Sequence, residues 1–388
     1  MGNKEKRAYL EAILRRYATA SRKNKKQILD EFCAVCRYNR KYAIRLLHRN
    51  PYRKRHKRGR KSRYSEPRFL KVLLSIWKAT DFMCSSRLKA CLPVWLPFYE
   101  QTAGPLTAEI QAKLHSISRA TLDRVLKPLR SRYHKGLCGT KPGKMLRTQI
   151  PIRTDNWDIT QPGFIEADTV AHCGTSLAGD FVWSLTMTDI KTTWTECRAV
   201  WNKGSEEVIA QVEQIERSLP FQLLAFDCDN GSEFLNYHLA RYFAKRDNPV
   251  QFTRSRPYKK NDNAHVEQKN WAHPRHLLGY GRIENPDLVP LINDVYANEW
   301  SLYQNHFCPS VKLISKTRIG SRYRKVYDAP TTPYQRVLTS PHVTNETKQQ
   351  LRITHKSLNP FSLKKEIERK LKIIFRYVSV TSILRQRI

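Results

Sequence analysis

The sequence predicts an α/β protein whose core is preceded by an all-α region and followed by a basic C-terminal region. Two observations lead to this prediction. Apolar residues recur at helical spacing through residues 8–48, whereas from residue 163 short runs rich in Val, Thr, Trp, Phe and Ile alternate with turn residues, as strands do. The chain has 388 residues, a length that favours two or three domains.

The charge distribution indicates a polyanionic partner. The formal net charge is +36. Counting Lys and Arg against Asp and Glu, residues 1–150 carry +28, residues 151–250 carry −7 and residues 251–388 carry +15. An acidic middle between basic arms is typical of a metal site in a protein that grips nucleic acid. A ribosome-associated or chromatin-like protein is the alternative, but such proteins rarely need a long α/β core.

Residues 8–48 predict three amphipathic helices, and Asn39 is placed to cap the third. The last two, joined by a short polar turn, resemble a helix-turn-helix with Lys41 and Arg45 on its second helix, where they would contact DNA. A plain helical hairpin is the alternative.

Residues 49–64 are almost without apolar side chains and predict a flexible basic linker that follows phosphates across a groove. A solvated linker without a binding role is the alternative. The linker residues predicted to contact DNA are Arg53, Lys54, Arg55, Lys57 and Arg58.

Helical periodicity returns at residues 68–78 and 108–129, where a break at residues 116–118 separates two helices. Ser118 is a good N-cap for the second of these, which makes a second helix-turn-helix. The early residues of that helix, from which a recognition helix reads a major groove, are Arg119, Thr121 and Arg124. Residues 135–160 contain Gly and Pro and predict a linker.

The central region predicts three consecutive antiparallel strands, then helices and strands in alternation, with a later parallel strand. Residues 305–343 predict irregular structure, and a basic helical tail follows. The expected core elements are strands at residues 164–170, 181–190 and 193–200, a helix at 205–219 with Ser205 as N-cap, a strand at 222–229, a helix at 232–246, a strand at 249–255, the helix that carries Glu267, and a helix at 286–304.

Three acids lie in distinctive surroundings: Asp168 in GFIEADTV, Asp229 in LLAFDCDNGSEF and Glu267 in NDNAHVEQKN. The first two lie near strand ends, where ligand sites of α/β folds gather, and the third lies on a helix. Three carboxylates brought together predict a site for a pair of Mg²⁺ ions. Strand alternation places Glu166 on the face of Asp168 and Asp227 on the face of Asp229, so the pattern leaves both open as ligands.

Polar residues around the third acid predict DNA contacts. Glu267 shares a helix face with Asn263, Asn270 and Trp271, which suits a metal ligand flanked by DNA contacts. The basic loop before this helix is predicted to hold phosphates, and a solvated loop is the alternative. Its residues are Arg254, Arg256, Lys259 and Lys260.

The order and surroundings of Asp168, Asp229 and Glu267 resemble those of bacterial insertion-sequence transposases with a retroviral-integrase-type (DDE) catalytic core. The segment DNGSEF begins with Asp229 itself, and the segment DNAHVEQKN surrounds Glu267. Between Asp229 and Glu267 there are 37 residues. The resemblance covers about residues 160–310. It implies a ribonuclease-H-like catalytic core.

The resemblance also implies an activity, that of a DNA transposase. Two Mg²⁺ (or Mn²⁺) ions held by Asp168, Asp229 and Glu267 would serve the hydrolysis of one strand at each element end, and the freed 3′-hydroxyl would attack target DNA. The implied partners are double-stranded DNA, as transposon ends and as target, and further copies of the chain. The alternatives are a catalytically impaired derivative acting as a repressor and a ribonuclease-H-like nuclease without strand transfer.

The sequence departs from the family at Pro274, seven residues after Glu267, where relatives often carry a basic residue. A proline there removes a helix hydrogen bond and predicts a kink. Lys269, Arg275 and His276 are the candidates to replace the missing basic residue in DNA contact.

The cysteines and the absence of targeting or membrane-spanning segments bear on the cellular compartment of the protein. The nine cysteines are scattered, and the pair Cys33 and Cys36 predicts ordinary helix cysteines rather than a zinc site, because no second pair follows. No secretory signal and no apolar run of about 18 residues is present, which predicts a bacterial cytoplasmic, nucleoid-associated protein without a membrane span. The expected domains are residues 1–64, 65–160, 161–310 and 311–388.

Overall fold

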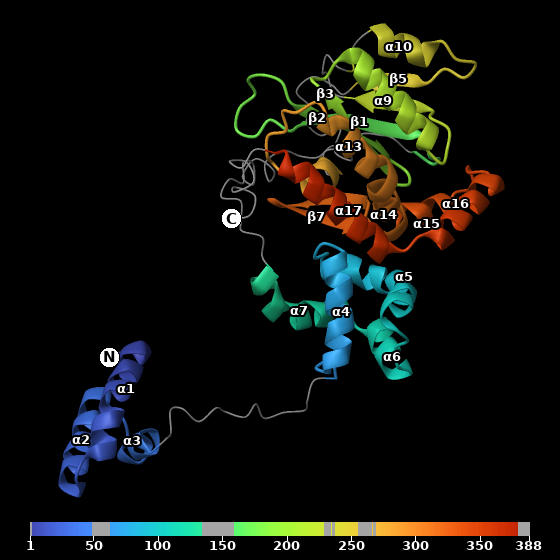
Figure 1. The fold of residues 1–388 in the computed structure, drawn as a ribbon. Helices are drawn as coiled ribbons and strands as arrows, with labels where there is room; N and C mark the ends of the chain where they lie inside the picture. The colour runs from blue at the N-terminus through green and yellow to red at the C-terminus, as the bar shows by residue number, and fades with distance from the viewer. Residues whose placement is uncertain are drawn as a thin grey trace. The chain divides into compact units, whose positions relative to one another are not determined.

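The structure is a computed structural model that describes residues 2–48, 63–133, 159–228, 234, 237–254, 266 and 269–378. It divides into two compact units, Met1–Ser62 and Arg63–Ile388 (Figure 1). Each unit has its own apolar core. In the described part of the chain, none of the helices combines the length and the apolar character needed to span a bilayer.

The first unit is a bundle of three helices: α1 (Asn3–Thr19), α2 (Arg22–Cys36) and α3 (Arg40–Leu47). Phe32 and Cys36 are fully buried in its core, and Cys33 packs against it. Arg37 adopts a left-handed conformation, which ends α2. The Asn39 side chain accepts a hydrogen bond from the Lys41 N–H at 3.0 Å, so the predicted cap of the third helix is confirmed.

The second unit begins with four helices: α4 (Pro67–Ala79), α5 (Ser85–Ala103), α6 (Ala108–Ser116) and α7 (Arg119–Tyr133). The Ser118 hydroxyl accepts a hydrogen bond from the Thr121 N–H at 3.2 Å and caps α7 as predicted. Helix α5 is not predicted from the sequence, and it contains Pro93 and Pro97. These prolines are tolerated because α5 is held by packing, with Trp95 buried in the main apolar cluster of the unit.

A mixed five-stranded sheet forms the centre of the second unit, with strand order β3-β2-β1-β4-β5. β1 pairs antiparallel with β2 and β2 with β3, while β4 lies parallel to β1 and β5 parallel to β4. The predicted set of three consecutive antiparallel strands followed by parallel strands is therefore confirmed. The strands are β1 (Phe164–Ala171), β2 (Val182–Asp189), β3 (Thr195–Trp201), β4 (Ala225–Cys228) and β5 (Gln251–Arg254).

Helices cover the two faces of the sheet. On one face, Ile165 and Ala167 of β1 share a core with α9 (Ser205–Ser218) and α10 (Tyr237–Ala244). Alternation along β1 therefore turns Glu166 and Asp168 towards the other face. α9 begins at Ser205 itself and Gly204 holds the cap position, so the predicted Ser205 N-cap is wrong by one residue.

Two π-helical turns lie on that second face. The first, η1 (Trp271–Arg275), contains Pro274 and leads into α12 (His276–Leu278). The second, η2 (Tyr296–Trp300), joins α13 (Leu288–Val295) to α14 (Ser301–Phe307). A π turn spreads one more residue over the turn, which accommodates the ring and the missing N–H of Pro274. The side chains of His273 and Trp300 meet edge to face, with ring centroids 6.0 Å apart.

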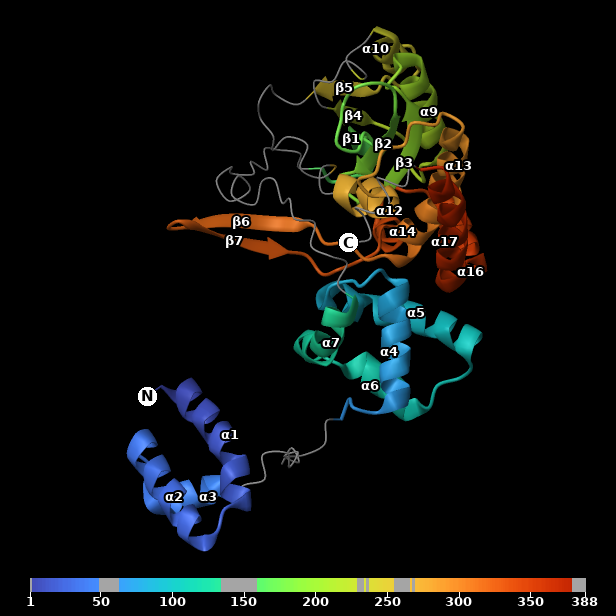
Figure 2. The same ribbon diagram turned by 60° about the vertical axis from the view of Figure 1, so that its left-hand side comes forward.

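The C-terminal region corrects one prediction. Instead of irregular structure, it contains an antiparallel hairpin of β6 (Leu313–Ile319) and β7 (Arg322–Tyr327), seen projecting from its unit in Figure 2. Charged residues at nearly every second position hid the strand pattern, since both faces of β7 are exposed. Three helices follow: α15 (Pro333–Thr339), α16 (Asn345–Ser357) and α17 (Pro360–Arg376).

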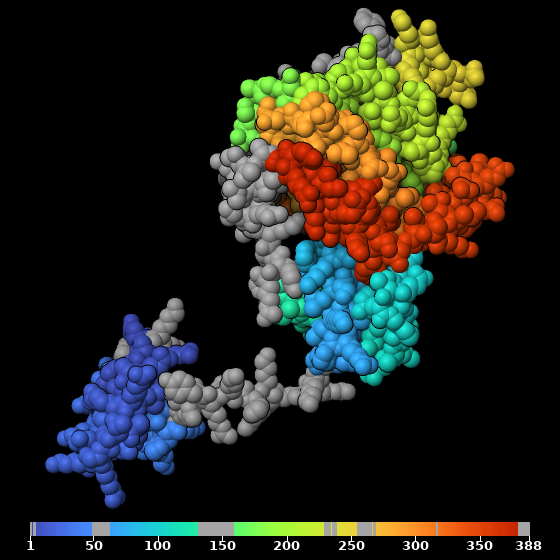
Figure 3. All heavy atoms as spheres, in the orientation of Figure 1, coloured from blue at the N-terminus to red at the C-terminus, as the bar shows by residue number. Residues whose placement is uncertain are grey.

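The predicted C-terminal tail is helical, but α17 is part of the core. Ile367 and Ile374 of α17 are buried in the same apolar cluster as Trp95 of α5 and Phe307 of α14. The Trp95 indole N–H donates to the Phe307 carbonyl at 3.0 Å. Figure 3 shows the C-terminal helices in red beside the blue and cyan N-terminal helices of the same unit, where α17 contacts α5.

Candidate active site

Asp168 lies on β1 directly after Ala167, which is opposite Cys228, the last described residue of β4 before Asp229. Its side chain is half-buried. One carboxylate oxygen accepts a hydrogen bond from the Thr169 N–H at 2.7 Å and the other accepts one from the Asn270 amide at 2.6 Å. The carboxylate is thus fixed in orientation from two sides while remaining partly open to solvent.

Glu166 and Asp227, the acids that the strand pattern left open, are both buried and lie opposite each other in the register of β1 and β4. Glu166 accepts a hydrogen bond from the Val266 N–H at 3.0 Å, and Asp227 accepts one from the Thr253 hydroxyl at 2.7 Å. Their carboxylates therefore bind neighbouring segments of the chain. Glu166 in particular joins β1 to the segment that immediately precedes Glu267.

Several predicted site residues lie outside the described residues. Asp229 directly follows Cys228, the last residue of β4, and Glu267 directly follows Val266. The structure brings together residues close in sequence to each of the three predicted acids. Glu166 is opposite Asp227 in the strand register and accepts a hydrogen bond from the Val266 N–H. The other predicted residues outside the described positions are Arg53, Lys54, Arg55, Lys57, Arg58, Arg256, Lys259 and Lys260, and nothing is described of the Arg254 side chain.

Asn270 makes a contact that the sequence does not predict. It was predicted as a DNA contact, and the structure places its amide N–H₂ on Asp168. The Asn270 amide oxygen is buried and finds no hydrogen-bond donor among the described residues. A carboxylate and an unsatisfied amide oxygen side by side are the hard oxygen donors that Mg²⁺ and Mn²⁺ accept.

The chemistry of this donor set fits a divalent metal ion. Within the described stretches, no group of three or more His, Cys, Asp or Glu residues could hold a metal. Two of the three predicted ligands, Asp229 and Glu267, lie beyond those stretches. The metal site thus stays a prediction that the described oxygens of Asp168 and Asn270 suit.

The three residues considered as substitutes near Pro274 make contacts inside the protein. The Lys269 amino group donates to the Thr193 carbonyl at 3.3 Å. The Arg275 guanidinium lies over the Tyr280 ring, 4.9 Å from its centroid. His276 approaches Asp81 at 3.5 Å.

Burial changes the charge state of Lys269. It lowers the pKa of the Lys269 ammonium to about 7, helped by the nearby positive charges of Arg87 and Arg336. Lys269 therefore carries less than a full positive charge near neutral pH, which makes it a weaker phosphate ligand than an exposed lysine.

The predicted DNA-contacting helices present exposed positive charge. Lys41 and Arg45 are exposed on α3, where the Arg45 guanidinium lies 5.1 Å from the Tyr42 ring centroid. Arg119 and Arg124 are exposed on the first turns of α7. The Arg124 guanidinium donates to the Thr121 hydroxyl at 3.2 Å, so Thr121 positions that arginine.

Two features of the site escaped the sequence reasoning: the bond from Glu166 to Val266 and the bond from Asn270 to Asp168. Each joins residues about 100 positions apart, and no local pattern reports such a contact. The nearest signal is the helical spacing of Asn270 relative to Glu267, which predicts that the two share a helix face.

Comparison with known proteins gives one close relative. The chain is 40% identical over 335 residues to the "Uncharacterized protein y4rM" of Sinorhizobium fredii (strain NBRC 101917 / NGR234), an alignment that covers 84% of this chain and 93% of that protein. No protein-family model matches the chain.

Similar solved structures include two retroviral integrase cores. The HTLV-2 integrase catalytic core domain in complex with magnesium (dimeric form) is 16% identical, covers 38% of this chain and 90% of its own, and has a TM-score of 0.28. The BIV integrase catalytic core domain is 15% identical, covers 46% of this chain and 96% of its own, and has a TM-score of 0.27. Scores this low do not establish a shared fold, so strand order and contacts carry the argument instead.

Proposed function

This chain belongs to the family of the Sinorhizobium fredii protein y4rM, and we propose that it is a DDE-type DNA transposase. It would cleave the ends of a mobile element and transfer the freed 3′-hydroxyl into target DNA. The observation that carries this proposal is the place of Asp168: a half-buried carboxylate on the first strand of a mixed sheet, directly after the residue that pairs with Cys228 of the parallel strand β4. The strand order β3-β2-β1-β4-β5 is the one that a ribonuclease-H-like core predicts.

The residues proposed to hold the metal ions are Asp168, Asp229 and Glu267. Bound Mg²⁺ or Mn²⁺, in a pair, would supply activation of the attacking oxygen and stabilisation of charge on the leaving 3′-oxygen. Asn270 would orient the Asp168 carboxylate through its 2.6 Å hydrogen bond. Glu166 would fix the start of the Glu267 helix by accepting from Val266, and so supports the site from within the sheet.

Double-stranded DNA is the proposed partner in the bacterial cytoplasm. The net charge of +36 supports a polyanion, and exposed arginines and lysines on α3 and α7 offer helix-borne contacts. Lys41, Arg45, Arg119 and Arg124 are the proposed contacts, alongside the basic linker at residues 49–64. Because two element ends must be held together for a joint reaction, we propose a homo-oligomer.

The proposed domains divide this work. Residues 1–64 and 65–160 would bind DNA, residues 161–310 would form the catalytic core, and residues 311–388 would add a basic C-terminal region. Support comes from the separate apolar core of the first unit and from the acidic charge confined to the middle of the chain.

The test is a cleavage and joining assay with the full chain and duplex DNA taken from both flanks of its gene. We expect metal-dependent nicking at a fixed position and, with a pre-cut end, a joined product. Specific binding without nicking in Mg²⁺ or Mn²⁺ would overturn the proposal in favour of a repressor. Nicking without any joined product would overturn it in favour of a nuclease.

A further inference from the structure

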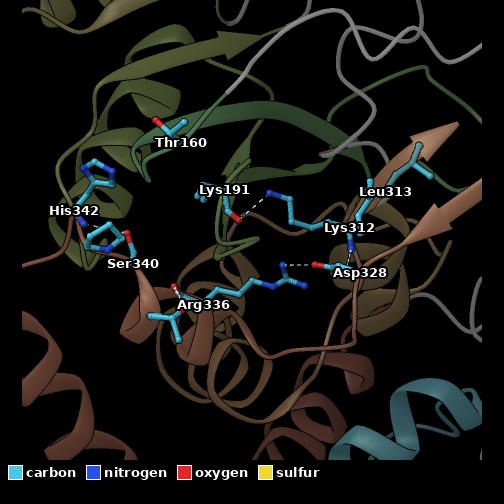
Figure 4. Close-up of a pocket in the computed structure, with 11 residues that line it drawn as sticks. Thr160, Lys191, Lys312, Leu313, Asp328, Arg336, Ser340 and His342 are labelled. Atoms are coloured by element: carbon cyan, nitrogen blue, oxygen red, sulfur yellow. Dashed lines mark hydrogen bonds and ion pairs between the residues drawn. The ribbon is translucent and has the colours of Figure 1, made fainter.

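A cavity of about 750 Å³ lies where the β6–β7 hairpin meets the rest of its unit (Figure 4). Three parts of the chain line it: the segments around Thr160 and Lys191, the two ends of the hairpin, and α15 with the turn after it. We call it the ribbon-root pocket. Its lining includes Lys191, Lys312, Asp328, Arg336, Ser340 and His342.

The pocket lies away from Asp168. In the register of β1 and β2, Asp168 is opposite Thr186 and Ile165 is opposite Asp189, so Lys191 follows β2 beyond the amino end of β1. Asp168 lies instead towards the carboxyl end of β1. A ligand in the pocket would therefore be separate from the metal site.

Positive charge exceeds negative charge in the pocket wall. Lys191, Lys312 and Arg336 face a single lining carboxylate, Asp328. That carboxylate is already engaged, because one of its oxygens accepts from the Lys312 backbone N–H at 2.6 Å and the other from the Arg336 guanidinium at 2.6 Å. The buried Asp189 nearby is likewise bonded, to the Thr192 and Gly163 N–H groups.

The cationic side chains retain unused donors. The Lys312 amino group, which has three N–H donors, makes one hydrogen bond, to the Lys191 carbonyl at 2.9 Å. The Arg336 Nη2 donates to the Ser310 carbonyl at 3.1 Å, while its buried Nε finds no acceptor in the part of the chain that the structure describes. Neither Lys191 nor Lys312 forms an ion pair with a described acid. An oxyanion would accept from the remaining N–H groups of Lys312.

The Lys312 ammonium lies in a mainly cationic environment, in which Asp189 and Asp328 offset burial and the neighbouring positive charges only in part. Burial lowers its pKa to about 8, and the positive charges of Arg336 and Lys191 add to this effect. A bound anion acts in the opposite direction, because an opposite charge within a few ångströms favours the charged ammonium. Occupancy of the pocket is therefore coupled to protonation of Lys312.

The hairpin that leaves the pocket is a basic ribbon. Residues 313–327 contain no Asp or Glu, and β7 is exposed along its whole length. Ile314, Ile319, Tyr323 and Tyr327 are also exposed, which adds apolar contact surface between the charges. The basic residues are Lys316, Arg318, Arg322, Arg324 and Lys325. A two-stranded ribbon of this kind is a shape that DNA grooves accept.

We propose that the ribbon-root pocket binds a phosphodiester group of DNA whose backbone runs along the β6–β7 ribbon. The proposal rests on the proposed function, since it takes DNA as the substrate. Charge complementarity selects a polyanion, and the unused donors of Lys312 and Arg336 select an oxyanion. Free phosphate shares this chemistry and is the source that the test must separate from DNA.

The first experiment measures the affinity of the full chain for duplex DNA from the flanks of its gene as salt is raised. In Lys191→Ala/Lys312→Ala we expect the slope of log affinity against log salt to fall by about 1 and the affinity to fall about tenfold. The matched control, Lys356→Ala/Lys372→Ala, removes two exposed lysines from α16 and α17. Equal effects in the two double variants would overturn the proposal.

The second experiment uses the wild-type chain and so does not depend on a variant folding. Acylation of Lys312 by a small amine reagent is followed by mass spectrometry with DNA, with inorganic phosphate, and with chloride at the same ionic strength. We expect DNA to protect Lys312 more than Lys356. Protection by phosphate without protection by DNA, or no protection by either, would overturn it.

The two proposals fail in different ways. If the wild-type chain neither binds nor cuts DNA, the proposed function itself is wrong. If the wild-type chain binds and cuts DNA while Lys191→Ala/Lys312→Ala binds it with unchanged affinity and salt slope, only the pocket proposal is wrong.

Discussion

The surroundings of Asp168 and the ribbon-root pocket lie towards opposite ends of β1 and have opposite chemistry. Around Asp168 the carboxylates of Glu166 and Asp227 are satisfied by N–H and O–H donors from other segments. In the pocket, Lys312 and Arg336 have more donors than the described chain supplies acceptors. One strand thus separates a place suited to cations from a place suited to anions.

The largest expected effect comes from Asp168. The substitution Asp168→Asn removes the charge of a proposed metal ligand. We expect metal-dependent cleavage to fall by about 1,000-fold or more, since such ligands are worth several kcal/mol of barrier. DNA affinity should change little. Asp229→Asn and Glu267→Gln are expected to behave alike. Cleavage rates with Mg²⁺ and binding isotherms without metal provide the measurement, and full cleavage by these variants would refute the assignment.

The next effect concerns the positioning of Asp168. Asn270→Ala removes a hydrogen bond to a carboxylate, and we expect a loss of about 10- to 100-fold in cleavage rate with DNA affinity retained. Asn270→Asp would place a like charge beside Asp168, raise the pKa of that carboxyl and move the pH–rate profile to higher pH. Asn298→Ala is the matched control, because it removes an exposed amide–carboxylate bond of 2.7 Å to Asp294. An unshifted profile would show that Asn270 does not act through Asp168.

Substitutions of Glu166 should lower the stability of the protein more than its cleavage rate. Glu166→Ala leaves the buried Val266 N–H without its acceptor, so we expect a loss of about 1–3 kcal/mol in the free energy of unfolding. Glu166→Gln retains an oxygen acceptor and should lose less. Urea unfolding and cleavage rates measured together make the comparison with Asp168→Asn. If Glu166→Gln abolished cleavage as fully as Asp168→Asn, Glu166 would itself be a metal ligand.

The effect that is smallest at neutral pH, and appears only as the pH falls, tests the helix that carries Arg336. On α15, Tyr334 stacks with His306 and His355, at centroid distances of 4.9 and 4.3 Å. Burial, and then His355, lowers the pKa of His306 to about 3. The unfolded chain binds this proton near its ordinary pKa of about 6.5, so stability is full above that pH and is lost as pH falls towards 3.

His306→Phe should therefore flatten the dependence of unfolding free energy on pH between about 6.5 and 3, by up to about 1.4 kcal/mol per pH unit. Denaturation series at several pH values provide the measurement. His115→Gln, at an exposed position, is the control and should leave the slope unchanged. Identical slopes for wild type and His306→Phe would rule out a buried neutral histidine there.

The central sheet could be predicted from the sequence because its signal is local. β1, β2 and β3 are dense in β-branched and aromatic residues, and turn residues separate them. α5 could not be predicted, because Pro93 and Pro97 oppose a helix that packing then stabilises. The β6–β7 hairpin could not be predicted for a different reason. Both faces of β7 are exposed, so its sequence shows no alternation of apolar and polar residues.

The candidate site, like the fold, could be predicted from the sequence only in part. Asp168 could be identified from its position near the end of an apolar strand, but alternation gives Glu166 the same face. The two acids differ in their contacts with residues far away in the sequence. Glu166 is buried and bonded to Val266, whereas Asp168 is half-buried and bonded to Asn270. Such contacts depend on how the helix approaches the sheet, which local sequence does not encode.

The π turn at Pro274 holds one residue more than an ordinary α-helical turn. Such a turn takes up the extra residue locally, so the helix on either side keeps the orientation that it would have without that residue. A deletion in an ordinary helical stretch has the opposite result, because it rotates all following residues by about 100°. We therefore expect the deletion of Ala272 to leave Leu277 and Leu278 facing the core, whereas a deletion directly before Leu277, at His276, would turn both away from it.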